Sequence, residues 1–196
     1  MLINKSYDMK DIVMIGGGGH AKVVLTILKK LKYNIIGYTD LVNCGTVLNT
    51  PYIGKDEELF NLDRKPKLAL GIGQLYKGKS RELLINKFLE NDFIFETIIS
   101  PDSTINIAVT IGQGTVVMDG AIIQTGTRIG DYSIINTNSS IDHDCKIGSY
   151  VHIAPGVTLC GEVSISDNCM VGTGSTIINN ITISKEKFIK AGSLIY

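Results

Sequence analysis

Aliphatic residues recur at every sixth position over the second half of the chain, without exception from Ile105 to Ile195. A residue six places along a strand stays on one face, whereas the same step drifts around a helix with a period of 3.6. A hexapeptide period therefore predicts a parallel β-helix, in which each repeat packs against its neighbours. The positions are Ile105, Ile111, Val117, Ile123, Ile129, Ile135, Ile141, Ile147, Ile153, Leu159, Ile165, Val171, Ile177, Ile183, Ile189 and Ile195.

A second inward position lies two residues before each aliphatic residue and carries mostly small side chains, such as Ala121, Ser133 and Cys145. One large and one small inward residue per side suit the narrow interior of a triangular coil. Three hexads per turn give a coil of about 18 residues and about five stacked coils. We therefore expect residues 101–196 to form a β-helix domain.

The preceding part of the chain has a different pattern, in which short apolar runs alternate with segments of helical periodicity. This alternation predicts a small parallel sheet with helices, and we expect a Rossmann-like parallel α/β domain over residues 1–100. Residues 41–54 look like a loop. Strands are expected at residues 12–15, 35–38, 68–73 and 93–99, and helices at residues 21–32, 55–61 and 80–89.

A glycine cluster follows the first expected strand. Gly16-x-Gly18-x-x-Ala21 fits the fingerprint of a strand-to-helix turn whose backbone N–H groups can approach a phosphate. Asp40 closes the second strand, where a carboxylate can bind a ribose or a base. Fewer than 100 residues form only half of a dinucleotide fold, so a mononucleotide fits better than NAD. A tight turn without a ligand is the alternative, and His20 could face a pyrophosphate or sugar, or cap the helix.

Two of the three histidines, His143 and His152, occupy outward positions of the hexads. His143 lies between Asp142 and Asp144, and a carboxylate beside an imidazole raises its basicity and fixes its tautomer. This arrangement is typical of a general base. A solvated surface histidine is the alternative. A zinc site of the carbonic anhydrase kind is a further alternative, but it needs three histidine ligands and the repeat has two.

Composition excludes several classes of partner. The chain has 19 basic and 19 acidic residues, so no basic field is present to attract nucleic acid. No apolar stretch reaches the ~20 residues of a membrane span, and the N-terminus lacks the apolar core of a signal peptide. The cysteines show no CxxC spacing and are expected to be reduced thiols in a cytoplasmic protein. They are Cys44, Cys145, Cys160 and Cys169.

Three segments carry a resemblance to a known family. Residues 15–21, 136–145 and 152–161 resemble those of the bacterial nucleotide-aminosugar N-acetyltransferases, whose relatives include sialic acid O-acetyltransferases. The resemblance extends over nearly the whole chain. It implies a first half that binds a UDP- or TDP-linked 4-amino sugar and a second half that is a left-handed parallel β-helix. It also implies a homotrimer with acetyl-CoA in the groove between neighbouring prisms.

The same resemblance implies roles for individual residues and requires no metal. The general base is His143, and its orienting acid is Asp144. The acetyl-CoA contacts are His152, Asn136, Thr173 and Gly161, whose N–H would polarise the thioester carbonyl. The nucleotide-sugar contacts are Gly18, Gly19, His20, Asp40 and Gly73.

The function expected from these observations is an acetyl-CoA-dependent N-acetyltransferase. It would act on the 4-amino group of a UDP- or TDP-linked amino-deoxysugar for surface glycan biosynthesis. A sugar O-acetyltransferase of the sialic acid type is the close alternative, because only the nucleophile differs. A non-catalytic nucleotide-sugar-binding protein is the alternative of another class, and it would bind its ligand without releasing CoA.

Overall fold

The computed structural model describes residues 10–74 and 79–196 and divides into two compact units, Met1–Glu96 and Thr97–Tyr196. The first unit contains a four-stranded parallel sheet of order β3-β2-β1-β4, which confirms the expected parallel α/β domain. Its strands are β1 (Asp11–Ile15), β2 (Asn34–Thr39), β3 (Tyr52–Gly54) and β4 (Lys67–Leu70). Its helices are α1 (Gly19–Lys30), α2 (Glu57–Phe60) and α3 (Ser80–Leu89).

The strand order creates a switch point between β1 and β4. The chain runs from β1 to β2 and β3 on one side, and then returns to pair β4 with the opposite side of β1. Helix α1 packs on both β1 and β4, and β1 is buried along its whole length. In open α/β sheets, ligands bind outside the carboxyl ends of the strands at such a point.

Two details of the first unit differ from the prediction. Residues 41–54, expected to be a loop, contain β3, a strand of three residues that is too short for its periodicity to be recognised. The strand expected over residues 93–99 is divided instead. Phe95 makes an isolated bridge to Leu68 in the first unit, whereas Ile98–Ile99 form β5 and pair with a strand of the second unit.

Aromatic packing fixes helix α3 within the first unit. Phe88, near the end of α3, meets Phe93 and Phe95 with ring centroids 5.4 and 5.8 Å apart in edge-to-face geometry. Phe60 of α2 completes the cluster at 5.1 Å from Phe88. These contacts set the position of the helix whose first residues reach the carboxyl edge of the sheet.

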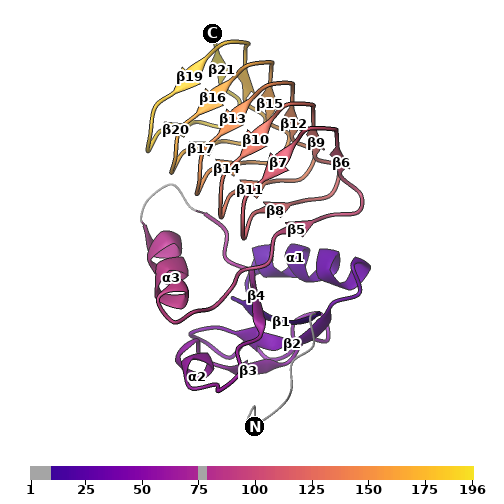
Figure 1. Ribbon diagram of the computed structural model, residues 1–196, viewed down its shortest axis with the longest axis vertical. Coiled ribbons are helices and arrows are strands. Elements are labelled where there is room, and N and C mark those ends of the chain that lie inside the picture. The colour runs from indigo at the N-terminus through magenta and orange to yellow at the C-terminus, as the bar shows by residue number, and fades with distance from the viewer. Residues whose placement is uncertain (1–9, 75–78) are drawn as a thin grey trace. The chain divides into compact units, whose positions relative to one another are not determined.

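The second unit is a parallel β-helix of two-residue strands, which confirms the expected repeat architecture. Figure 1 shows the strands stacked as successive coils, and they form three sheets that we call sheets I, II and III. Sheet I contains β5 (Ile98–Ile99), β8 (Val116–Val117), β11 (Ile134–Ile135), β14 (His152–Ile153), β17 (Met170–Val171) and β20 (Phe188–Ile189). Sheet II contains β6 (Thr104–Ile105), β9 (Ile122–Ile123), β12 (Ser140–Ile141), β15 (Thr158–Leu159), β18 (Thr176–Ile177) and β21 (Leu194–Ile195). Sheet III contains β7 (Thr110–Ile111), β10 (Arg128–Ile129), β13 (Lys146–Ile147), β16 (Ser164–Ile165) and β19 (Thr182–Ile183).

Every pairing within these three sheets joins residues one 18-residue coil apart, such as Ile135 with Ile153. The aliphatic positions form one continuous core. Most of the small inward side chains are also buried, and the polar group of most buried ones bonds to the carbonyl of a residue 15 positions later. Thr127 Oγ1 donates to Asp142 O at 2.8 Å, and Cys145 Sγ contacts Cys160 O at 3.2 Å. These bonds satisfy the polar side-chain atoms that the narrow interior of the coil encloses.

Candidate functional site

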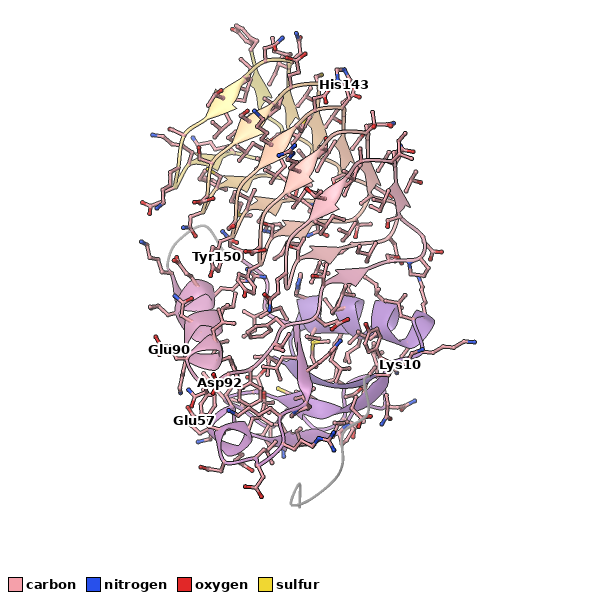
Figure 2. All side chains as sticks on the ribbon, in the orientation of Figure 1. Lys10, Glu57, Glu90, Asp92, His143 and Tyr150 are labelled. Carbon is pink, nitrogen blue, oxygen red and sulfur yellow. The ribbon has the colours of Figure 1, made fainter. Side chains whose placement is uncertain are left out.

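The histidine–aspartate pair lies at the corner between sheets II and III, in the turn that follows β12. Figure 2 shows His143 projecting from the outer edge of the solenoid. Its Nδ1 is 2.9 Å from Asp144 Oδ2, and its backbone N–H donates to Asp142 Oδ1 at 2.8 Å. The His143 side chain is 50% exposed, so a substrate can reach the ring.

The local backbone turns the Asp144 carboxylate toward the imidazole. Asp144 has a left-handed φ of 57°, and its N–H donates to Thr125 O in the preceding coil at 3.0 Å. Gly126 lies beneath it, and a Cβ on this glycine would lie 2.3 Å from Asp144 Oδ1. A glycine at this position therefore leaves room for the carboxylate that orients His143.

The electrostatic surroundings raise the pKa of His143. The hydrogen bond that the ring donates to Asp144 is the main cause, partial burial opposes it, and the negative charges of Asp142, Asp144 and Glu162 add to the rise. Asp144 also favours the tautomer with the proton on Nδ1. In the neutral ring, Nε2 is then the nitrogen that can accept a proton from a substrate.

Gly161 lies one coil beyond His143 and directly against its ring. A Cβ on Gly161 would lie 2.6 Å from His143 Nε2 and 2.7 Å from Cε1. The residue is buried, its carbonyl accepts from Asn180 N–H at 3.1 Å, and its own N–H has no hydrogen-bond partner in the described residues. His143 Nε2, which can accept a proton, therefore lies next to Gly161, whose backbone N–H can donate a hydrogen bond to a ligand. The 18-residue spacing between these positions is a signal for this contact that the sequence interpretation left unused.

The second histidine, His152, lies on sheet I and faces away from the core, because Ile153 beside it points inward. The outward position agrees with the prediction, but His152 is only 8% exposed. Its Nε2 is 3.1 Å from Asn136 Nδ2, while Asn136 Oδ1 accepts the Thr137 N–H at 2.8 Å. The amide therefore presents its NH₂ group to the ring, which makes Nε2 the acceptor.

The residues predicted for acetyl-CoA fall into two groups on one chain. Asn136 and Thr173 follow strands of sheet I and lie at the corner between sheets I and II, near His152 of β14. Gly161 lies instead at the corner between sheets II and III, with His143. The strands of sheet II separate the two corners, so a single chain does not bring all of these residues together.

The glycine loop of the first unit opens helix α1 at the carboxyl end of β1. Gly18 is the N-cap, no side chain caps the helix, and the first turn has no acidic residue. Gly18 and Gly19 are exposed, with no atom within 4 Å of a Cβ built on either. Open backbone at the positive end of a 12-residue helix suits a phosphate group.

The other predicted sugar-nucleotide residues lie at the same edge of the sheet. Asp40 follows β2, and its Oδ2 accepts the Gly17 N–H at 2.7 Å. Gly73 follows β4 and faces His20, since a Cβ on Gly73 would lie 3.6 Å from His20 Cβ. The structure thus gathers Gly18, Gly19, His20, Asp40 and Gly73 around the carboxyl ends of β1, β2 and β4.

A cavity of about 300 Å³ at this edge includes a residue that the sequence interpretation missed. Asp56 lines it together with Asp40, and Asp56 Oδ1 accepts the Thr39 hydroxyl at 2.6 Å. Burial raises the pKa of Asp56, the charges of Glu57 and Asp40 add to the rise, and the Thr39 hydrogen bond opposes it. The sequence interpretation missed Asp56 because it did not recognise β3, the strand that ends two residues before it.

The described residues offer neither a metal centre nor a membrane span. No cluster of three or more His, Cys, Asp or Glu side chains in residues 10–74 and 79–196 could hold a metal ion. None of the helices in these ranges is long and apolar enough to cross a bilayer.

Comparison with known proteins agrees with both halves of the chain. Residues 11–88 match the PglD N-terminal domain, and residues 126–161 match the bacterial transferase hexapeptide repeat. A search of curated proteins found no match.

Two solved structures are similar over nearly the whole length. PerB from Caulobacter crescentus, solved in complex with CoA and GDP-perosamine, is 31% identical with a TM-score of 0.87. The match covers 98% of this chain and 91% of PerB. The acetyltransferase domain of PglB from Neisseria gonorrhoeae, in complex with acetyl coenzyme A, is 28% identical with a TM-score of 0.70, over 94% of this chain and 95% of that domain. Given its identity with PerB over both domains, this chain belongs to the family of bacterial hexapeptide-repeat sugar acetyltransferases.

Proposed function

We propose that the protein is an acetyl-CoA-dependent N-acetyltransferase that acts on the 4-amino group of a nucleotide-linked amino-deoxysugar for surface glycan biosynthesis. The similarity to an enzyme described as GDP-perosamine N-acetyltransferase supports the reaction and the class of substrate. The family resemblance implied UDP or TDP as the nucleotide, whereas GDP is the nucleotide bound to this relative.

The His143–Asp144 pair against Gly161 is the observation that carries this proposal. His143 Nε2 accepts a proton from the sugar amine as the amine nitrogen attacks the thioester carbonyl carbon. Asp144 stabilises the imidazolium, and the Gly161 N–H donates to the oxyanion that develops on the carbonyl oxygen. The carbon–sulfur bond then breaks, and the proton held by His143 passes to the departing CoA thiolate. No covalent acetyl-enzyme is required when both substrates are held together.

The acetyl-CoA site would be completed by a second subunit of a homotrimer. Asn136, His152 and Thr173 lie on one side of sheet II, and Gly161 and His143 lie on the other. A molecule that contacts both groups can do so when one corner of a prism faces a different corner of its neighbour. The separation of the two groups on one chain supports this arrangement.

The N-terminal unit would hold the nucleotide part of the sugar donor. The uncapped N-terminus of α1, with Gly18 and Gly19 open to solvent, suits the pyrophosphate. His20 and Gly73, side by side at the same edge, would contact the pyrophosphate or the sugar. Asp40 would bind the base or the ribose.

Release of free thiol from acetyl-CoA, measured with a panel of GDP-, UDP- and TDP-linked amino sugars, tests the function. We expect turnover with an amino acceptor, and a His143→Ala variant should lose about 10²–10⁴-fold in turnover, the usual contribution of a positioned base. Lys185→Ala, an exposed change at the corner between sheets III and I, is the matched control and should retain activity. Thiol release only with hydroxyl acceptors would replace N-acetylation by O-acetylation. A loss under threefold in His143→Ala would remove this residue from its role.

A further inference from the structure

We propose that the cavity in the N-terminal unit recognises guanine through the carboxylates of Asp40 and Asp56, so that the acceptor is a GDP-linked sugar. The inference rests on the proposed function, because it assigns the nucleotide of the same substrate. It adds Asp56 to the binding residues and replaces the expected UDP or TDP.

The position of the cavity suits a nucleobase. It lies at the carboxyl edge of the sheet and shares Gly16 with the glycine loop, so a base within it would be close to a phosphate at the start of α1. Three aliphatic side chains, Leu41, Ile72 and Leu84, line it. Apolar walls with a few polar groups are the usual composition of a small-molecule site, and about 300 Å³ is within the range of such sites.

The two carboxylates each keep one oxygen for a ligand. Asp40 Oδ2 accepts from Gly17 N–H at 2.7 Å, and Asp56 Oδ1 accepts from the Thr39 hydroxyl at 2.6 Å. In the described residues, Asp40 Oδ1 and Asp56 Oδ2 accept no hydrogen bond. The internal bonds restrain both side chains, each of which keeps a second carboxylate oxygen as an acceptor, and both residues line one cavity.

Two carboxylates in one cavity suit the donor pattern of guanine. Its Watson–Crick edge presents the N1–H and the 2-amino group side by side, whereas uracil and thymine present one N–H between two carbonyl oxygens. A carbonyl oxygen placed against a carboxylate is repelled, so only one of the two carboxylates could be satisfied by uracil or thymine. Adenine offers an amino group beside an unprotonated ring nitrogen, which also opposes a second carboxylate. Guanine O6 could accept from the Ser80 hydroxyl, which lines the same cavity.

The electrostatics of the cavity agree with this assignment. Burial raises the pKa of Asp56 against the opposing Thr39 hydrogen bond, and the charges of Glu57 and Asp40 add to the rise, so the charged form of Asp56 is held at a cost. Two N–H donors from one base would stabilise the charged form of both carboxylates. A hydrogen bond to a charged group is the strong kind, and its loss is felt strongly in a partly buried site.

Isothermal titration of the full-length protein with GDP, IDP, UDP and TDP, in the presence of EDTA, tests the inference. IDP differs from GDP only in lacking the 2-amino group. We expect GDP to bind about 10–100-fold more tightly than IDP, which corresponds to the loss of one charge-assisted hydrogen bond, and more tightly than UDP or TDP. Equal affinity for GDP and IDP, or tighter binding of UDP or TDP, would overturn the assignment while leaving the acetyl-transfer reaction standing.

A pair of variants separates base recognition from a general effect of charge. Asp56→Asn should reduce the preference for GDP over IDP to less than about threefold and change the affinity for UDP by less than that. Glu57→Gln removes the same charge from the next residue, which lies outside the cavity and pairs with Lys87, and it should retain the full preference. A preference that persists in Asp56→Asn would exclude this carboxylate as a determinant. Thiol release with amino sugars remains a separate measurement, so failure of the proposed reaction would be recognised independently.

Discussion

The contact between Gly161 and His143 makes a methyl group at position 161 a sharp test of the active site. Gly161→Ala would place a Cβ 2.6 Å from His143 Nε2, whereas ordinary van der Waals contact begins at 3.4 Å. The ring must therefore retreat by about 0.8 Å. Because the His143 side chain is half exposed, it can swing toward solvent instead of displacing the backbone.

The expected loss follows from the size of this displacement. A misplacement of about 1 Å in a reacting group can reduce turnover by about 10²-fold, which is about 2.7 kcal/mol of transition-state stabilisation. The fold should be nearly unaffected. The φ of Gly161 is outside the left-handed region that alanine avoids, so the melting temperature should change by less than about 4 °C.

A double-mutant cycle provides the control. When His143 is already alanine, the new methyl group meets no ring, so the double variant should be no less active than His143→Ala alone. The backbone N–H at position 161 is present in all of these variants, so the cycle isolates the steric effect. Thiol release measured for the four proteins would refute the reasoning if Gly161→Ala stayed within threefold of the unchanged protein, or if the two losses were additive.

Three further changes test other parts of the site and fold. His143 must be neutral to accept a proton, and its pKa is raised, so kcat/KM should rise with pH through a midpoint above 6.5. Asp144→Asn should move that midpoint to lower pH, and an unmoved pH profile would contradict the role of Asp144. Asn136→Ala removes the donor to His152 Nε2, so the KM for acetyl-CoA should rise about 5–50-fold with little change in kcat, and an unchanged KM would exclude this contact from the cofactor site. Ile141→Ala leaves a cavity at a fully buried position of the solenoid core and should lower the free energy of unfolding by about 2–5 kcal/mol, measured by denaturant titration. A loss below about 1 kcal/mol would show that the coil collapses around the cavity.

The solenoid was predictable because its constraint repeats. A large aliphatic side chain at one position in six defines the inward face, and the pairing of Arg128 with Lys146 follows once three hexads close a coil. The hydrogen bonds of the small inward residues were not predictable from periodicity. In the sequence, Thr127 and Cys145 are recognisable only as small side chains, and the carbonyls to which they bond lie at the same corner of the next coil.

The candidate site was predictable only where local sequence determines it. His143 and Asp144 are adjacent in the chain, so their pairing could be inferred directly. Asp56 was out of reach, because its place in the cavity depends on β3, a three-residue strand at the edge of the sheet, where a few backbone hydrogen bonds outweigh weak local preference.

Because every neighbour along the solenoid axis is one whole coil away, the length of the prism changes only in fixed steps. Removing or duplicating one complete coil would shorten or extend it by ~4.8 Å and return each later side chain to an equivalent corner. Losing a single residue would instead turn each later inward side chain outward. Related proteins can therefore differ in the length of the solenoid by whole coils while the same residues stay at each corner.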